Sequence, residues 1–295
     1  MPTRQMKVGF FQVVVTNPNT PVAFNAILQT LNAIPNDRRR TMLAADEPVR
    51  LRLLQQTGGG WLGDLGKIRL HEDLDKSTID GIETKIPLQD DEGLLEKTAF
   101  FYHPRTKIIA IQQLAGSVSA SSCGRYFKTL GGVQKIEFRP VIKDDALTRI
   151  MQMGTVEKFQ IRFAGIDSGR PLRGGHASAR NMIQSLRNLR APKASINLQI
   201  DRDTTTLEHV GQFIADALDW DRRGDLTVEK ILVVGSDGEA DEISVIDLFK
   251  DRVVEILPVE VQDGRKFDDA SRYSAVRTAW NRQQASLAER FGNAN

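Results

Sequence analysis

The chain has 295 residues, with 40 lysines and arginines, 38 aspartates and glutamates, and a formal net charge of +2. Hydrophobic content of 40% and charged content of 26% are typical of globular proteins, which excludes disordered, collagen-like and coiled-coil chains. Because the sequence contains neither a run of about 18 apolar residues nor a signal-type start, we expect a cytoplasmic protein that does not insert into a membrane.

The first half of the chain has apolar patterns of both periods. Helical patterns cover residues 21–34, 119–130 and 144–151, and strand patterns cover residues 8–15, 49–53, 98–103, 107–113, 133–142 and 155–164. A turn at residues 103–106 joins two of these strands into a hairpin. Serines before residue 120 and glycines at 131 and 132 are typical of the two ends of a helix.

The second half continues in the same way. Helical patterns cover residues 176–189, 206–220 and 268–291, and strand patterns cover residues 194–200, 228–234, 243–248 and 253–261. The apolar stripe of the last helix favours packing on a sheet over packing on a partner subunit. The glycine-rich stretch 165–171 is the best boundary. We therefore predict an α+β fold with mixed, largely antiparallel sheets and flanking helices, in two lobes at residues 1–165 and 166–295.

The small net charge hides blocks of opposite sign. Residues 61–96 and 201–251 are rich in acids, whereas residues 97–143 are rich in bases. The stretch 168–200 holds no acid and carries six bases, namely Arg170, Arg173, Arg180, Arg187, Arg190 and Lys193. Such blocks favour a positive surface for a polyanion, unless the acidic and basic segments interleave in space.

The acid-free stretch is the strongest candidate for a binding surface. On the predicted helix, Arg180, Arg187 and Arg190 fall on one face, and the other face is expected to hold Met182, Ile183, Leu186 and Leu189. Arginine forks bind phosphate oxygens, so the pattern predicts sequence-tolerant contacts with the backbone of double-stranded DNA. Four further bases are expected to extend this surface, namely Arg125, Lys128, Lys135 and Arg139. A homodimer is expected, because two-fold symmetry often completes such surfaces.

Evidence for catalysis is weak. The sequence has no phosphate-binding loop, dinucleotide-binding glycine motif, nucleophile elbow or zinc-protease motif, so we expect no cofactor and no metal and favour a binding protein over an enzyme. An arginine beside Cys123 is compatible with an activated thiol, but a small buried cysteine is favoured. His176 is a candidate phosphate contact or an exposed spectator.

Short apolar patterns from residue 97 to residue 291 point to a known family. They lie at residues 98–102, 108–111, 133–141, 194–200 and 231–234, and the last of these strands runs into Asp237-Gly238-Glu239. Their order resembles the phage-lambda RexA-like exclusion and abortive-infection proteins. That resemblance implies a DNA-binding, dimeric, cytosolic sensor that acts with a membrane effector when another phage infects, and it assigns no catalytic residue.

We therefore predict a DNA-binding sensor or activator of a phage-exclusion or anti-phage defence system. Two alternatives stay open. The first is a metal-dependent nuclease built on the acidic turn that holds Asp237, Glu239, Asp241 and Glu242. The second is a protein-interaction module whose acidic blocks face a basic partner.

Overall fold

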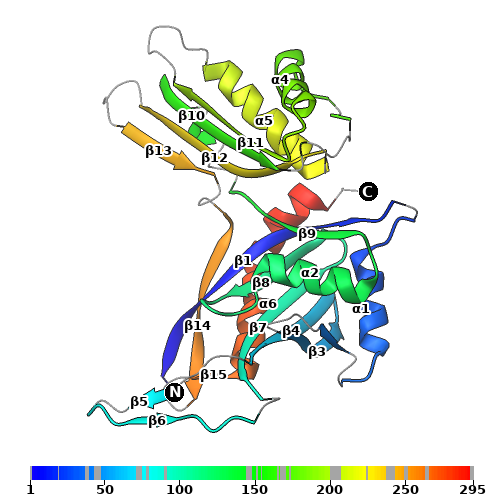
Figure 1. Cartoon of the computed structure of the whole chain (residues 1–295), viewed down its shortest axis with the longest axis vertical. Helices are drawn as coiled ribbons and strands as arrows, with labels where there is room; N and C mark the ends of the chain where they lie inside the picture. The colour runs from blue at the N-terminus through cyan, green and yellow to red at the C-terminus, as the bar shows by residue number, and fades with distance from the viewer. Residues whose placement is uncertain are drawn as a thin grey trace. The chain divides into compact units, whose positions relative to one another are not determined.

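The computed structural model describes residues 2–18, 20–36, 40–42, 48–70, 75–77, 80–89, 92–143, 148–150, 152–153, 155–164, 166, 171–172, 174–199, 207–223, 225–236, 243–248, 252–262 and 266–292. The fold is α+β, as predicted, and every described strand pairing is antiparallel. Two compact units make up the chain (Figure 1). The first unit combines Met1–Val141 with Val254–Asn295, and the second is the inserted segment Ile142–Val253.

The predicted boundary between residues 165 and 166 does not match this division. Strand β10 (Thr155–Ala164) lies between β11 (Lys193–Gln199) and β12 (Thr227–Ser236), so it belongs to the second unit. In contrast, β14 (Val254–Gln262) pairs with β1 (Thr3–Thr16) in the first unit, with Lys7 opposite Ile256. A glycine-rich stretch marks a break in regular structure, but the partner of a strand decides which unit it joins.

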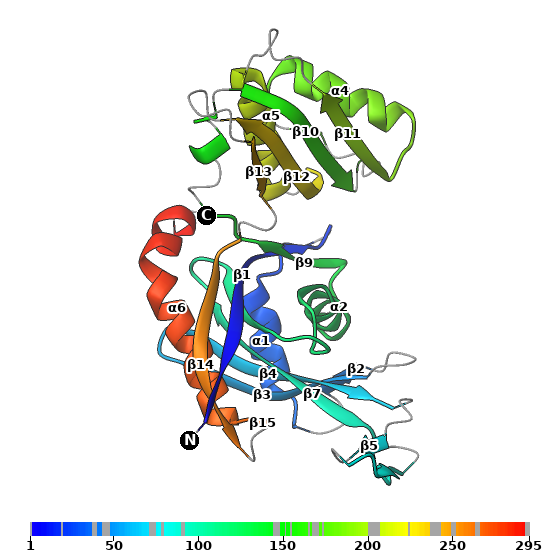
Figure 2. The same cartoon turned by 90° about the vertical axis from the view of Figure 1, so that its left-hand side faces the viewer.

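The first unit is built around a long, curled antiparallel sheet (Figure 2). Its strand order is β15-β14-β1-β8-β7-β4-β3-β2, and β9 pairs with the distal half of β1. A separate two-stranded hairpin, β5 (Asp75–Ser77) and β6 (Glu83–Lys85), lies in the acidic stretch. The remaining strands are β2 (Thr41–Met42), β3 (Val49–Thr57), β4 (Gly60–Arg69), β7 (Leu94–His103), β8 (Ile108–Gln113), β9 (Lys135–Pro140) and β15 (Lys266–Phe267).

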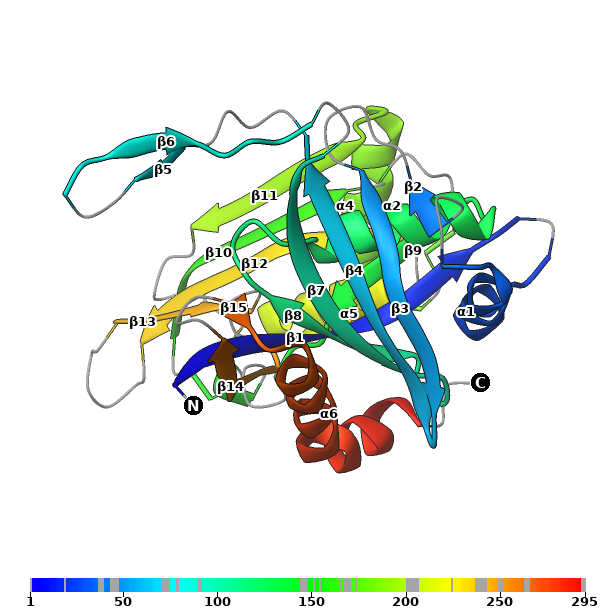
Figure 3. The ribbon, with the colours of Figure 1, turned by 90° about the horizontal axis from the view of Figure 1, so that it is seen from below.

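Helices cover both faces of this sheet. On one face, α1 (Phe24–Ala33) and α2 (Ala120–Gly131) pack through edge-to-face rings, with Phe24 against Phe127 at 5.0 Å and Phe100 against Phe127 at 5.7 Å. Phe101, the next residue on β7, faces the other way and meets Trp280 of α6 (Asp269–Phe291) at 5.7 Å. Figure 3 shows α2 and α6 on opposite sides of the sheet. The interpretation of the last helix as a core element is therefore confirmed.

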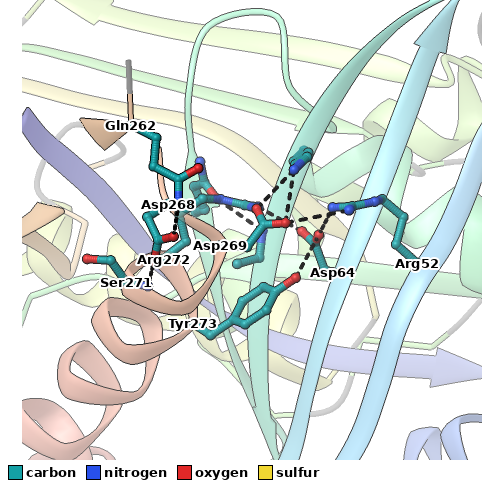
Figure 4. A network of polar contacts seen from close by, with 11 residues as sticks. Arg52, Asp64, Gln262, Asp268, Asp269, Ser271, Arg272 and Tyr273 are labelled. Atoms are coloured by element: carbon teal, nitrogen blue, oxygen red, sulfur yellow. Dashed lines mark hydrogen bonds and ion pairs between the residues drawn. The ribbon is translucent and has the colours of Figure 1, made fainter. Parts of the chain in front are cut away.

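A buried carboxylate on β4 anchors the start of α6 (Figure 4). Asp64 is fully buried, and its Oδ1 accepts a 2.7 Å hydrogen bond from Nη2 of Arg272, which is 1% exposed. Its Oδ2 accepts a 3.1 Å bond from the Tyr273 hydroxyl and contacts the guanidinium of Arg52 on β3. A carboxylate can stay charged in a core when donors satisfy its oxygens, and these three side chains do so.

The same arginine joins the helix to two further strands. Arg272 Nη1 donates to Asp269 at 2.7 Å, and its Nε donates at 3.0 Å to the side-chain oxygen of Gln112, which also accepts the backbone N–H of Ala99. Lys97 Nζ lies 2.9 Å from Asp269 Oδ2. Burial raises the pKa of Asp269, but the hydrogen bonds from Lys97 and Arg272 outweigh it, so the pKa lies below its ordinary value.

The second unit has two layers. Its four-stranded sheet has the order β11-β10-β12-β13, with β13 at Ile243–Asp247. Helices α4 (Ala177–Asn188) and α5 (Leu207–Arg223) both pack on one face of it. The buried residues of that layer include Phe159, Ile161, Phe163, Ile183, Ile214, Trp220, Ile231 and Val233. Among the described residues of the whole chain, no helix combines the length and apolar character that crossing a membrane requires.

We expect Asp64→Ala to lower the free energy of unfolding by about 3 kcal/mol or more, because it leaves the buried Arg272 without its main counter-charge. Arg282→Ala is the control. It removes a 3.3 Å pair with Glu255 whose arginine side chain is 54% exposed, and it should cost less than about 1 kcal/mol. Urea denaturation of both variants measures the difference, and equal losses would contradict the anchoring role of Asp64.

We also expect the stability of the protein to fall as pH drops below the ordinary histidine pKa of about 6.5. Burial and then the charge of Arg105 lower the pKa of His103, which stacks on Trp280 at 4.7 Å. The unfolded chain therefore takes up this proton first, and protonation favours unfolding. Urea midpoints between pH 5 and pH 8 should decline less steeply for His103→Gln than for the wild type, and parallel curves would refute the contribution.

Candidate nucleic-acid interface

The predicted basic helix exists. Helix α4 begins after His176, whose backbone N–H and Nδ1 both bond Asp216 of α5, at 2.8 and 2.9 Å. Asp216 therefore engages Nδ1 of His176, while 56% of the histidine side chain is exposed. Of the six bases of the acid-free stretch, Arg170 and Arg173 lie outside the described residues. The other four fall on α4, on the turn after it and on β11.

Two of these arginines are available to a ligand. Arg180 is exposed on α4, and Arg190 is exposed just beyond the helix in a left-handed conformation with φ of 54°. Neither has an ion pair within the part of the chain that the structure describes. Both stand on a segment, residues 174–199, that contains no acid. Among the described residues, the guanidinium groups of Arg180 and Arg190 form the centre of the candidate interface.

Arg187 has a structural role instead. Its Nε donates a 3.0 Å hydrogen bond to the carbonyl of Ile166, and its side chain is half-buried. Burial lowers the pKa of Arg187, and Asp225 partly opposes that shift. The guanidinium ties α4 to the segment before it, so the predicted row of three surface arginines is reduced to two.

Lys193 lies on a different surface. It stands on β11 beside Ala164 of β10, where it points to the face of the sheet opposite α4, and its Nζ lies 2.6 Å from Glu229 of β12. The acid-free stretch therefore does not form one basic face. The apolar face of α4 also differs from the prediction. Ile183 is buried as expected, but Met182 is 37% and Leu189 75% exposed.

The four supporting bases belong to the first unit. Arg125 and Lys128 are exposed on α2, whereas Lys135 and Arg139 stand on β9 on either side of Glu137. Both lie within ion-pair distance of that glutamate, at 2.5 and 2.9 Å. Burial raises the pKa of Glu137, but the two cations outweigh it, and the pKa is lowered.

Arg139 is 6% exposed. A buried and paired guanidinium is not offered to a phosphate, so the prediction that Arg139 contacts DNA is corrected, and Lys135 keeps a partner that a ligand would have to displace.

The sequence offers two candidate catalytic sites, the acidic turn and Cys123. The acidic turn with Asp237, Glu239, Asp241 and Glu242 lies outside the described residues. Elsewhere, the described ranges hold no group of three His, Cys, Asp or Glu residues able to bind a metal. Cys123 is buried in α2, and burial raises the pKa of its thiol to about 12, although its backbone hydrogen bond opposes the shift. The small buried cysteine is confirmed, and the activated thiol is wrong.

A second group of exposed bases lies outside the set of DNA contacts that the sequence predicts. Lys158 and Arg162 on β10 and Lys230 on β12 point away from α4 and α5, on the open face of the second sheet. The alternation of residues 158–163 of β10, with Phe159, Ile161 and Phe163 inward, is the sequence signal that indicates this outward group. A count of charges along the chain does not single them out, because Lys158 follows Glu157 and Lys230 follows Glu229.

The described residues thus define an α+β protein with exposed basic groups on both layers of its inserted unit. The chain belongs to a family of unknown function, DUF6731, whose model matches residues 1–284. A search of curated proteins gives no match. The resemblance to RexA-like proteins is not tested by the family match and stays a prediction.

We expect Cys123 to be inert in the native protein, because its thiolate forms only at strongly alkaline pH. Incubation with an aromatic disulfide reagent at pH 8 should give no colour until urea is added, and then one thiol per chain, since the sequence has one cysteine. Rapid labelling without urea would contradict the burial of this side chain.

Proposed function

We propose that this protein binds double-stranded DNA through the phosphate backbone, without strong sequence preference, and that α4 and the turn after it provide the central contacts. Arg180 and Arg190 are the described residues of this surface, and Arg170 and Arg173 are assigned to it from the sequence. Arg125 and Lys128 are secondary candidates on the first unit.

One observation carries the proposal. Residues 174–199 contain three arginines, one lysine and no acid, and they form a helix and an edge strand whose polar side chains are mostly exposed. A soluble surface ordinarily mixes both signs of charge, so a helix without an acid has a net attraction for polyanions. Guanidinium groups suit phosphate oxygens because their donors are fixed in a planar fork.

The wider role follows from the resemblance of residues 97–291. In this proposal the chain is a cytoplasmic DNA-binding sensor or activator in phage exclusion or anti-phage defence, and a membrane effector is its downstream partner. A homodimer is part of the proposal. Its support is β11, a strand of seven residues at the edge of the second sheet. Within the described part of the unit no strand pairs with its outer edge, and its only charged residue is Lys193, so a second copy of the chain can pair with it.

Fluorescence anisotropy with labelled 30-base-pair duplexes of unrelated sequence tests the DNA proposal. We expect salt-sensitive binding of similar strength to all duplexes, and at least a tenfold loss for Arg180→Ala/Arg190→Ala. Losing two phosphate contacts should also reduce the slope of log affinity against log salt by about 1.8. Arg4→Ala/Lys7→Ala removes two exposed bases of β1 and is the matched control. Equal affinities for the two double variants would sink the proposed surface.

The nuclease alternative has its own test. Plasmid incubated with the protein and Mg²⁺ or Mn²⁺ should stay intact if the protein only binds DNA. Cleavage that disappears in Asp237→Ala would replace the binding proposal with a metal-dependent reaction at the acidic turn.

A further inference from the structure

The four-stranded sheet of the second unit has one face that its two helices do not cover. Helices α4 and α5 both pack against the inward residues of β10 and β12, and the described residues of this unit place no helix of comparable length on the opposite side. In Figure 2 the strands of this sheet lie in front of α5. The outward side chains are largely exposed, and Val245 of β13 reaches 61%.

The strand registers define what lies on this face. Arg162 of β10 stands between Ser195 of β11 and Lys230 of β12. One row along, Gln160 stands between Asn197 and Leu232. The row after that places Lys158 of β10 between Gln199 and Val234, with Val245 next on β13. Cations, amides and aliphatic side chains are thus arranged in adjacent rows on one surface, with the carboxylate of Asp247 on β13 beside Leu232.

Two like charges face each other at its centre. Arg162 and Lys230 are directly opposite across an antiparallel pair, where Cβ atoms lie about 5 Å apart and like charges are destabilising. Neither has an ion pair within the described residues. Glu229 bonds Lys193 at 2.6 Å, and Asp247 stands on the outermost strand opposite Leu232. The fold therefore retains a repulsion that an anionic ligand would relieve.

The surface suits one strand of nucleic acid better than a compact anion. Phosphates can lie on Lys158, Arg162 and Lys230, while Gln160 and Asn197 offer donors and acceptors to base edges. The aliphatic side chains Leu232, Val234 and Val245 give the base faces an apolar support. A four-stranded antiparallel sheet is a platform on which unstacked bases can lie flat, and in a duplex those base faces are already covered by stacking.

We propose that the open face of β11, β10, β12 and β13 binds single-stranded nucleic acid, with Lys158, Arg162 and Lys230 as the phosphate contacts. This site is separate from the α4 surface, because the two lie on opposite layers of the second unit. It does not depend on the DNA proposal made above.

Anisotropy with labelled 20-nucleotide oligo-dT and oligo-U, and with a 20-base-pair duplex, tests the site. We expect Arg162→Thr/Lys230→Thr to weaken single-strand binding at least tenfold and to reduce its salt slope by about 1.4. Arg4→Thr/Lys7→Thr, with the same loss of charge on a strand of the first unit, should change the affinity less than twofold. Arg180→Ala/Arg190→Ala should likewise leave single-strand binding within twofold.

Stability separates loss of binding from loss of fold. Because threonine suits a strand and the substitution removes a like-charge pair, the unfolding free energy of Arg162→Thr/Lys230→Thr should equal or exceed that of the wild type. If the double variant is instead destabilised, Lys158→Thr, at an exposed position of β10, carries the test and should weaken single-strand binding at least threefold.

Three results would overturn this inference. The first is unchanged single-strand binding by the stable sheet variants. The second is a loss of single-strand binding in the α4 variant alone, which would leave the α4 surface as the nucleic-acid site. The third is equal competition by poly-glutamate, which would indicate an acidic protein partner. A loss of duplex binding in the sheet variant alone would refute the proposed role of α4 while leaving this site in place.

Discussion

The first unit depends on the charge of Asp64 being satisfied. This carboxylate has no exposed surface, and its principal donor, Arg272, comes from a helix 208 residues further along the chain. Burying either charged side chain without the other would strongly destabilise the fold, because a buried charge without a counter-charge is far less stable than the same charge in water. Together they fix where α6 begins on the sheet. Once that end is held, Trp280 and Leu287 are directed into the unit and close its outer layer.

The second unit is organised by a different constraint, which is the sidedness of a single sheet. The buried apolar side chains of β10 face α4 and α5, so Lys158, Gln160 and Arg162 are displayed on the opposite surface. Basic residues that are dispersed in the sequence thereby become neighbours, as Arg162 and Lys230 do. The same sidedness separates Arg180 from Lys193, although these residues are close in sequence.

The sequence predicted local structure well because local rules decide it. Ser119 caps α2 by accepting the N–H of Ser122, and Gly132 adopts φ of 60° after the helix, as the serines and glycines had indicated. The strand at Thr155–Ala164 agrees with its prediction at both ends. The alternation of β10 was also visible, but which of its faces stays open depends on the helices that pack on the other.

Long-range partners limited the rest. The burial of Arg139 accompanies the pairing of β9 with β1, where Arg139 lies opposite Gln12. The carbonyl that holds Arg187 belongs to Ile166, 21 residues earlier in the chain. Leu189 is exposed at the C-cap of α4, because the helix ends one residue earlier than the apolar pattern. A count of charges along the chain therefore located a candidate region but could not decide which of its arginines would be free.

The discontinuity of the first unit also bears on how the protein is made. A ribosome releases β1 to β9 first, then the whole inserted unit, and β14 and α6 last. Until that final segment emerges, Asp64 lacks Arg272 and one edge of β1 lacks β14. Domains fold as units during synthesis. We therefore expect the inserted unit to complete its core before β14 and α6 join the first unit. The nascent chain therefore carries a first-unit sheet without one edge strand until β14 is released.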